Sequence, residues 1–416
     1  MSTENSTGFI RFLMKELKPR GKVLTPFNVL ALLTVIAAVV ILYIRFTQGL
    51  GSVGHASQDH PWGLWINFNV ITGVAFAGGA YVVTFMFYIL GQKKYQPIVR
   101  ATVLYALLAY MFYAGALLLD LGRPWKVVNP IIGNSFGISS VLFLVAWHFI
   151  LYMISLFIEF SPAVTEWARL KKTRKVAVSF TLGVVIFGIA LSTLHQSGLG
   201  ALFLMAKPKI HPLWYSEFIP ILFFISSIFA GLSLVIILET IAQKAFRKEM
   251  SPKYKKAHKG ISVSLARTCS MAIFVYLSMV ILVFIHGKDY AYLNSGWGRW
   301  FMVEILGFVF IPGVLFTYAW RRNNLNVVRI AAVLTIIGII LNRLNISTFT
   351  YLWYDNEIFF PTWQEIVVCV AVIFVQVLVF RWIVRRMPVY SEPPAWASIK
   401  RKKETVIYEE EKVMYN

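Results

Sequence analysis

The chain has 416 residues, of which 58% are hydrophobic and only 14% are charged. This composition carries too much apolar surface for a single water-soluble core. The formal net charge of +21 could favour nucleic acid, but the basic residues occur in short clusters between apolar runs, a pattern typical of membrane topology. We therefore expect an all-α polytopic membrane protein surrounded by membrane lipid, and no nucleic-acid partner.

Residues 1–23 precede the first apolar run and form a polar, basic segment. They lack the apolar stretch and small-residue cleavage site of a secretory signal, so we expect the first span to direct insertion. Apolar and basic residues alternate in this segment: Phe9, Ile10, Arg11, Phe12, Leu13, Lys15, Leu17 and Lys18. The alternation fits either a short helix on the inner membrane surface or an ordinary basic flank, and both interpretations stay open.

Ten stretches are apolar enough to cross a bilayer, whose core of about 30 Å needs about 20 residues of helix. We place them at 24–46, 67–90, 100–120, 138–160, 177–196, 216–241, 262–286, 300–320, 327–346 and 364–385. Residues 24–386 therefore form the predicted membrane domain.

The basic residues orient these spans. Alternate connections and the two terminal segments contain most of the 40 Lys and Arg residues, and the remaining connections contain few. The positive-inside rule places the first set in the cytoplasm. We expect a multi-pass protein of the inner (cytoplasmic) membrane with both termini in the cytoplasm. Residues 387–416, with a basic run at 400–403 and an acidic run at 409–411, form a mobile or partner-bound cytoplasmic tail.

Several ionisable side chains are predicted near the outer surface of the membrane. Such groups cost at least ~2.5 kcal/mol on insertion scales, so they mark function more often than in soluble proteins. Four spans supply acid, base and amide groups at one predicted depth: Asp120, His195, Gln196, Glu304, Asn342 and Arg343. Each could be a structural pair or a snorkelling end residue, but their convergence favours a functional site.

A second set lies deeper or toward the inner surface. Glu239, Glu159 and His148 could form the steps of a proton route from the cytoplasm. Structural roles stay open, because Glu159 and the nearby Arg267 could be ion-paired or snorkelling groups. A lone histidine such as His148 in an apolar helix could also simply bond a neighbouring carbonyl.

The available ligands argue against a metal cofactor in this chain. Cys269 and Cys369 lie far apart inside apolar runs, so they offer no iron–sulfur site. A b-type haem needs axial ligands facing one another at equal depth, whereas His148 is predicted mid-membrane and His195 and His286 near the outer edge. We predict no haem and no iron–sulfur cluster in this chain.

The second predicted span contains a run of small residues, at Ala75 and 77–80. Such residues let another backbone come close, so packing is the favoured explanation over a direct ligand role. Phe76-Ala77-Gly78 is echoed by Phe229-Ala230-Gly231 in the sixth span, which is a weak indication of an internal repeat.

Six short motifs follow one another along the chain. They are GLGSV at 49–53, PWGLWI at 61–66, LDLGR at 119–123, LHQSGLG at 194–200, KIHPLW at 209–214 and FPTWQE at 360–365. Together they resemble the NrfD/PsrC superfamily of quinone-interacting membrane subunits, especially its ten-helix branch, to which the hydrogenase-2 membrane subunit belongs. The resemblance extends over residues 50–385.

This resemblance implies two four-helix bundles, at about 67–196 and 216–346, with one flanking helix at each end. It also implies a menaquinone or ubiquinone headgroup near the outer face, beside an outer-side (periplasmic) ferredoxin-like iron–sulfur subunit and further redox subunits of a respiratory complex. Carried onto this sequence, it makes Asp120, His195 and Gln196 candidates for the quinone pocket, and the depth argument adds Glu304 and Arg343 as quinone-binding residues.

Two-electron quinone chemistry needs two protons, so the site requires hydrogen-bonding proton carriers. His195 is the natural carrier, with Asp120 or Glu304 to orient or recharge it, and we assign catalytic roles to His195 and Asp120. If electrons and protons arrive from opposite sides, turnover is coupled to proton translocation.

Two other functions compete with this interpretation. A secondary transporter with an intramembrane substrate or proton site would explain the intramembrane charges and the faint repeat. Against it, the spans lack paired Gly/Pro breaks at corresponding positions, although Pro220 and Pro312 each interrupt a helix. A passive anchor for a periplasmic enzyme would need only one or two spans.

Overall fold

The computed structural model describes residues 11–12, 14–54, 60, 62–132, 139–355 and 360–397. Every named element within these ranges is helical. The only β-type pairing among them is an isolated antiparallel bridge between Ile210 and Tyr351. The predicted all-α fold class is therefore confirmed.

Ten helices in the described part are long and apolar enough to cross a membrane, as the sequence predicts. They are α2 (Pro26–Gln48), η2–α3–η3 (Trp65–Ile89), η4–α4 (Lys93–Asp120), α6 (Val141–Trp167), α7–η6 (Lys171–Ala206), α8 (Ile219–Ala245), α9 (Pro252–Gly287), α10–η8–α11 (Gly296–Arg321), α12–η9 (Leu325–Phe349) and α13 (Trp363–Val384). The protein is thus a polytopic membrane protein.

Some spans are longer than predicted, and at the start of α9 polar and basic residues continue the helix beyond its apolar stretch. α9 begins at Pro252 rather than at 262, with Ser251 capping it by accepting a hydrogen bond from the backbone N–H of Tyr254 at 3.2 Å. The fifth span ends at Ala206 rather than at 196. His195 therefore lies about three turns inside its span and not at its end.

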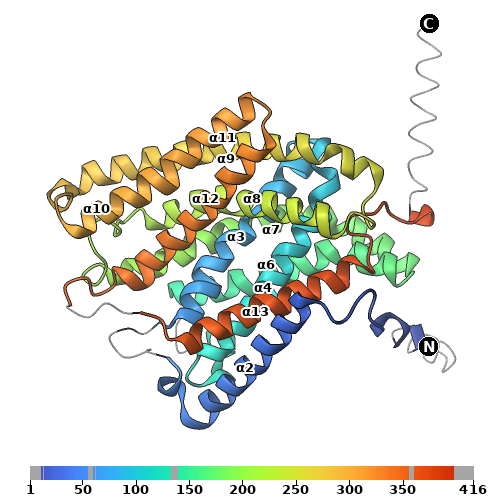
Figure 1. The fold of residues 1–416 in the computed structure, drawn as a ribbon, viewed down its shortest axis with the longest axis horizontal. Helices are drawn as coiled ribbons and strands as arrows, with labels where there is room; N and C mark the ends of the chain where they lie inside the picture. Colours follow the sequence, from blue (N-terminus) through green and yellow to red (C-terminus); the bar gives the residue numbers. More distant parts are fainter. Residues whose placement is uncertain are drawn as a thin grey trace, which may run out of the picture.

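The helix α3 (Gly73–Thr84) lies at the centre of the packing. It contacts α4 (Gln96–Asp120), α7 (Lys171–Ala201) and α8, while α6 packs against α4 and α7. Beyond α8, the helices α9, α11 (Ile311–Arg321) and α12 (Leu325–Leu344) pack on one another. α2 and α13 lie side by side at one edge, as Figure 1 shows. The division into two four-helix bundles with flanking helices stays a prediction.

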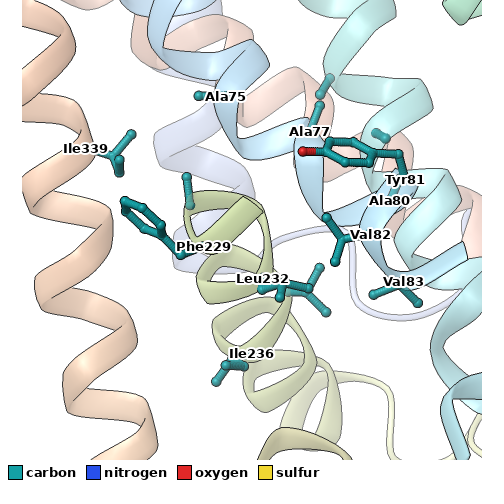
Figure 2. Close-up of a cluster of buried hydrophobic side chains, with 14 of the residues drawn as sticks. Ala75, Ala77, Ala80, Tyr81, Val82, Val83, Phe229, Leu232, Ile236 and Ile339 are labelled. Carbon is teal, nitrogen blue, oxygen red and sulfur yellow. The ribbon is translucent and has the colours of Figure 1, made fainter. Parts of the chain in front are cut away.

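Glycines let α3 and α8 cross at very short distance. A Cβ atom added at Gly231 would overlap the backbone nitrogen of Gly79, and one at Gly78 would lie 2.5 Å from the carbonyl oxygen of Ser227. Buried apolar side chains of both helices surround this crossing (Figure 2). The small residues of the second span therefore serve packing, and the two echoed segments, 76–78 and 229–231, lie on the helices that meet here.

Three spans contain four π-helical segments, which are η2 (Trp65–Thr72) and η3 (Phe85–Ile89) of the second span, η8 (Val303–Phe310) and η9 (Asn345–Phe349). Such wide turns are uncommon and occur frequently at functional sites. Buried polar side chains lie on three of them, including Asn67, Glu304 and Asn345. The π segments therefore indicate where polar groups are built into the apolar spans.

The connections 90–92, 168–170 and 246–251 and both described terminal segments gather at one end of the helices, which we call the basic end. There, Arg100 Nη1 donates to the carbonyl oxygen of Pro388 at 2.9 Å. Residues 11–12 and 14–17 are helical, and the Phe12 ring packs on Trp167 with 5.2 Å between centroids. A short N-terminal helix is therefore present, although Phe9, Ile10 and Leu13 lie outside the described residues, as does 398–416.

Candidate functional site

The carboxylate of Glu304 is buried on η8, toward the end of the helices opposite the basic end, and it accepts three hydrogen bonds. The donors are Trp214 Nε1 at 2.8 Å, Asn342 Nδ2 at 2.8 Å and Asn345 Nδ2 at 2.5 Å. They come from the 207–218 connection, from α12 and from η9. Because the donors approach from three segments, the carboxylate is held in one orientation.

Arg343 on α12 is 1% exposed and lies beside this carboxylate group. Its Nη1 donates to Asn342 Oδ1 at 2.8 Å, and its Nη2 donates to Ser226 Oγ at 2.6 Å. The guanidinium carbon is 3.6 Å from the centroid of the Phe223 ring. The Nε atom is buried and has no hydrogen-bond partner among the described residues. A buried donor of this kind is costly, so it is a site for an acceptor.

Glu304 and Arg343 line one cavity between α8, α9, η8 and α12, and Asn342 bridges them through its two side-chain polar atoms. The rest of the wall is mainly apolar and aromatic: Leu213, Trp214, Tyr215, Ile219, Leu222, Phe223, Tyr276, Val280, Val283, Phe284, Phe301, Ile305 and Ile346. Asp289, which lies outside the spans, also lines it, and burial raises the pKa of this carboxyl. Such a cavity suits a flat apolar ring with polar substituents.

Aromatic rings pack on one another beside this cavity, at the end of the protein opposite the basic end. His211 packs against Trp353, Tyr292 and Trp214 with centroid separations of 4.6, 5.2 and 5.6 Å. Burial lowers the pKa of His211 to about 4, so its ring is neutral near pH 7 and its Nδ1 accepts from the Leu213 backbone N–H at 3.2 Å. The motif KIHPLW is therefore a structural layer that also positions Trp214.

His195 belongs to a second group, on α7 and α4. Its side chain is buried, and its Nδ1 lies 2.9 Å from the hydroxyl of Tyr110. The rings of Tyr110 and Phe149 each pack on the imidazole at 5.5 Å between centroids. A proton can pass between a phenol and an imidazole that are hydrogen-bonded to each other. The residues lining the Glu304 cavity do not include His195.

Gln196 and Asp120 lie apart from both groups. Gln196 Nε2 donates to the carbonyl oxygen of Val74 on α3 at 2.8 Å. Asp120 ends α4, and its carboxylate lies with that of Glu365 around Gly63, whose Cβ position would be 3.2 Å from Asp120 Oδ1 and 2.9 Å from Glu365 Oε1. The predicted outer residues are therefore divided among four places, and of these residues only Glu304, Asn342 and Arg343 share a cavity.

Glu239 on α8 is buried near the basic end. Its Oε1 accepts from the hydroxyl of Tyr105 at 3.2 Å and from that of Tyr390 at 3.3 Å, and the two phenol oxygens are 2.5 Å apart. Burial, followed by the charge of Glu239, raises the pKa of Tyr390 well above its ordinary value, so this phenol remains a donor. Glu239 Oε2 is buried with no hydrogen-bond partner in the described part of the chain.

The other two predicted proton-route residues lie on α6. Within the described residues, the Nδ1 atom of His148 and the Oε1 atom of Glu159 are buried without hydrogen-bond partners. His148 and His195 lie on the adjacent helices α6 and α7. Because the fifth span continues past His195, this histidine lies deeper in its span than the sequence predicted.

Two adjacent serines of α8 make polar contacts with different helices. The Tyr81 hydroxyl of α3, visible in Figure 2, lies 3.1 Å from Ser227 Oγ of α8. Ser226, the preceding residue on α8, accepts from Arg343 Nη2 of α12 at 2.6 Å. Hydroxyl groups of α8 therefore contact both α3 and the Arg343 side of the cavity.

Sequence reasoning missed several partners of the predicted residues. Trp214 and Asn345 bind Glu304, Tyr110 binds His195, and Tyr390 binds Glu239. Only Trp214 and Asn345 gave a usable signal, since each lies in or beside a motif or polar run near a span end. Tyr110 and Tyr390 are ordinary tyrosines in the sequence, and their roles depend on helix packing.

Comparison with known families gives one match that covers most of the chain. The family model described as polysulphide reductase, NrfD, matches residues 52–352. This range includes the His195 group and the Glu304 cavity residues. It ends before α13 and before the segment that carries Tyr390.

Similar proteins are matched over nearly their whole length. A protein of Nitratidesulfovibrio vulgaris is 39% identical over 383 residues, which cover 92% of this chain and 98% of the relative. A probable Ni/Fe-hydrogenase 2 b-type cytochrome subunit of Escherichia coli is 28% identical, with 89% and 93% covered. The integral membrane subunit of a menaquinone reductase of N. vulgaris is 26% identical, with 86% and 90% covered.

Proposed function

This chain belongs to the polysulphide reductase NrfD family, and from that premise we propose that it is the quinone-binding membrane subunit of a respiratory oxidoreductase complex. Its relatives include subunits of hydrogenase and menaquinone reductase complexes. The observation that carries the proposal is the cavity in which Glu304 and Arg343 face a mainly apolar wall inside the membrane spans. Menaquinone or ubiquinone is the proposed substrate.

The chemistry of a quinone headgroup suits the groups of this cavity. The ring is flat and apolar, and each of its two carbonyl oxygens accepts a hydrogen bond. Arg343 Nε supplies a buried donor that lacks a partner among the described residues, and Phe223 holds the guanidinium from one face. Glu304 supplies a fixed acid–base group for the protons that accompany two-electron reduction. We assign quinone binding to this pair. Gln196, also predicted to bind the quinone, does not line the cavity and donates instead to the Val74 carbonyl on α3.

The remaining predicted residues fit a route for protons. Glu239 and its two phenol partners lie at the basic end. His148 and Glu159 lie on α6, and His195 of α7 contacts Tyr110. We propose that His195 carries protons toward the quinone. Asp120, beside Glu365, is proposed as an outer proton acceptor.

The proton route makes a direct prediction for Glu239. Changing Glu239→Gln should leave quinone binding intact but abolish the membrane potential formed during turnover in vesicles, because the amide cannot carry a proton. Ser233→Ala on the same helix is the matched control, since Ser233 is equally buried but not ionisable. An E239Q variant that keeps both turnover and potential removes Glu239 from the route.

We propose that the basic end faces the cytoplasm of the inner membrane and that the opposite end faces a periplasmic iron–sulfur subunit. The basic connections support this orientation through the positive-inside rule. The opposite end exposes large aromatic side chains, including Trp125, Tyr290, Tyr354 and Trp363, each more than half exposed. Such rings fit a membrane boundary or a protein interface. Electrons would pass between the quinone and the partner's clusters.

The proposed absence of haem is a separate point, because one relative is named a b-type cytochrome subunit. His148 and His195 lie on adjacent helices, and His195 is about three turns inside its span, so the predicted difference in depth no longer separates them as ligands. His195 is instead enclosed by the rings of Tyr110 and Phe149, which leaves its surroundings filled by side chains. We expect the purified subunit to lack a Soret absorption band, and a stoichiometric haem spectrum would contradict this.

A binding titration tests the proposed function most directly. Fluorescence quenching by a quinol-analogue inhibitor should saturate with the wild-type protein, and Arg343→Lys should weaken binding about 10- to 100-fold, since a hydrogen bond to a charged group contributes about 1.5–3 kcal/mol. Arg267→Lys is the matched control, because Arg267 stacks on Trp320 at 4.9 Å and does not line the cavity.

The same titration with His195→Ala and Asp120→Asn locates the headgroup. Unchanged affinity in both, with weak binding in R343K, supports the Glu304–Arg343 cavity. Weak binding in H195A alone would move the headgroup to the His195 group. The absence of saturable binding to folded wild-type protein would instead support the alternative function, a secondary transporter with an intramembrane substrate or proton site.

A further inference from the structure

A cavity at the basic end is lined by five cationic side chains. It lies between residues 19–23, the first turn of α2 and the last turns of α13. The cations are Arg20, Lys22, Arg381, Arg385 and Arg386, and no carboxylate is among the described residues that line the cavity. Like charges repel at these separations unless something negative lies between them.

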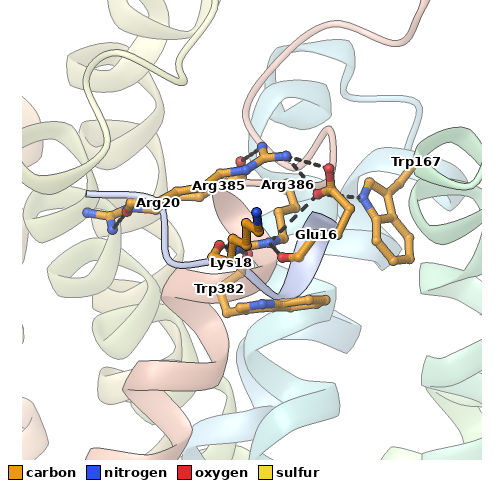
Figure 3. A network of polar contacts seen from close by, with 7 residues as sticks. All are labelled: Glu16, Lys18, Arg20, Trp167, Trp382, Arg385 and Arg386. Carbon is orange, nitrogen blue, oxygen red and sulfur yellow. Dashed lines mark hydrogen bonds and ion pairs between the residues drawn. The ribbon is translucent and has the colours of Figure 1, made fainter. Parts of the chain in front are cut away.

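One carboxylate, that of Glu16, lies in the polar network around these residues (Figure 3). Arg20 Nη2 is 2.7 Å from Glu16 Oε2, and Arg386 Nε is 3.7 Å from the same atom. The Arg386 side chain is only 2% exposed. Its pKa is lowered first by burial and then by the charge of Arg20, with Glu16 opposing this. Within the described ranges, this single acid leaves most of the positive charge of the five cations uncompensated.

Backbone carbonyl groups, which are neutral, accept most hydrogen bonds of these arginines. Arg386 donates to the carbonyl oxygens of Glu16 at 2.5 Å and Lys18 at 2.6 Å. Arg20 donates to the carbonyl of Arg385 at 2.7 Å, and Arg385 donates back to that of Arg20. We call this set of contacts between residues 16–20 and 385–386 the terminal clamp. It holds the cations together without neutralising them.

Several donors remain available to a ligand in the cavity. Among the described residues, Lys22 Nζ and the Nε and Nη2 atoms of Arg385 have no hydrogen-bond partner, and Arg381 uses only Nη1, toward Asn28 Oδ1 at 2.8 Å. One guanidinium group can donate two parallel hydrogen bonds to two oxygens of the same phosphate. The spare donors therefore fit a phosphate group better than a single carboxylate.

The position of the cavity relates it to the membrane surface. α2 begins at Pro26 and α13 ends at Val384, so the cavity lies where the spans leave the apolar core. The adjoining face of α2 is apolar and open to its surroundings, with Val29, Leu30 and Leu33 at 42%, 56% and 60% exposure. Basic pockets at this level between transmembrane helices bind lipid headgroups.

We propose that this cavity binds the phosphate of an anionic phospholipid, whose acyl chains lie along α2. The lipid supplies the negative charge that the terminal clamp lacks, so it ties residues 19–23 to the end of α13. Lys22, Arg381 and Arg385 contact the phosphate, while Arg386 stays bonded to the N-terminal segment. This site is separate from the proposed quinone cavity and does not depend on it.

Native mass spectrometry of the full-length protein tests the site, after delipidation and addition of phosphatidylglycerol or phosphatidylcholine. We expect one tightly retained phosphatidylglycerol and little retained phosphatidylcholine. The double variant K22Q/R385Q should lower retention about tenfold or more, because each lost charge near the surface contributes about 1 kcal/mol. The control is K255Q/R321Q, which removes one Lys and one Arg exposed outside this cavity.

A second measurement covers the case in which K22Q/R385Q does not fold. Phosphatidylglycerol added to the wild type should slow amide hydrogen exchange over residues 378–386, and phosphatidylcholine should not. Equal retention and protection by both lipids, or full retention by K22Q/R385Q, would overturn the proposal. Protection by millimolar inorganic phosphate equal to that by phosphatidylglycerol would also overturn it, because the ligand would then be a free anion.

Discussion

Replacing Glu304 by glutamine is expected to lower quinone turnover by about 100-fold or more, which is the usual contribution of a positioned acid–base group. Glu304 lines the cavity together with Arg343 and is held by Trp214, Asn342 and Asn345. Glutamine keeps the shape but cannot take up or release a proton. Turnover is measured with membranes containing the whole complex and a soluble quinone.

The size of this effect has to be separated from loss of folding. A glutamine amide faces at least one of the three donors with its own N–H group, which costs about 1–3 kcal/mol. The elution profile and thermal unfolding of the purified E304Q variant therefore accompany the assay. Glu217→Gln is the matched control, because the Glu217 side chain is 77% exposed and its one ion pair within the described part of the chain is with Lys207. Turnover of folded E304Q within a few-fold of wild type would exclude Glu304 from the chemistry.

Replacing Gly231 by alanine is expected to prevent stable folding. The added Cβ would overlap the backbone of Gly79, and neither backbone can move aside as a flexible side chain can. α3 and α8 would separate, and the buried cluster drawn in Figure 2 would lose contacts on both helices. We expect a loss of about 3 kcal/mol or more in the free energy of unfolding, at the upper end of the range for overpacking.

The matched control for this variant is the same change at Gly115 on α4, where an added Cβ meets nothing within 4 Å. G115A should be as stable as wild type or slightly more stable, because alanine is the better helix former. The yield of monodisperse protein in mild detergent and its unfolding temperature measure both variants. Equal behaviour of G231A and G115A would contradict the close helix crossing.

The fold was predictable to the level of its spans. Apolar runs of sufficient length identify each of the ten helices, since the bilayer sets the length that a helix needs. The start at Pro252 was not predictable from hydropathy, because the helix there continues through polar and basic residues beyond the apolar core. The end at Ala206 was missed because polar residues 195–197 and the glycines at 198 and 200 interrupt the apolar run. The small residues of the second span, including Gly78, predicted that another backbone comes close. Gly231 was noted only as part of the echoed segment, and only the packing shows that it lies at the same contact.

The candidate site was predictable in part. The cost of burying charge pointed to Glu304 and Arg343, and the structure places both on one cavity. The same argument grouped Asp120 and His195 with them, but depth along a helix says nothing about the direction in which a side chain points. Tyr390 had no signal at all, since it lies after the last span and reaches Glu239 only through the folded chain.

The contact between Tyr390 and Glu239 also has a consequence for biogenesis. Residue 390 leaves the ribosome after all ten spans, and the terminal clamp that precedes it joins residues 385–386 to residues 16–20, which are among the first to be made. A chain that stops before residue 390 therefore leaves Glu239 without one of its two phenol partners. The Tyr390 contact with this buried carboxyl forms only after synthesis has passed residue 390, so copies truncated before that point differ from the longer subunit at this acid.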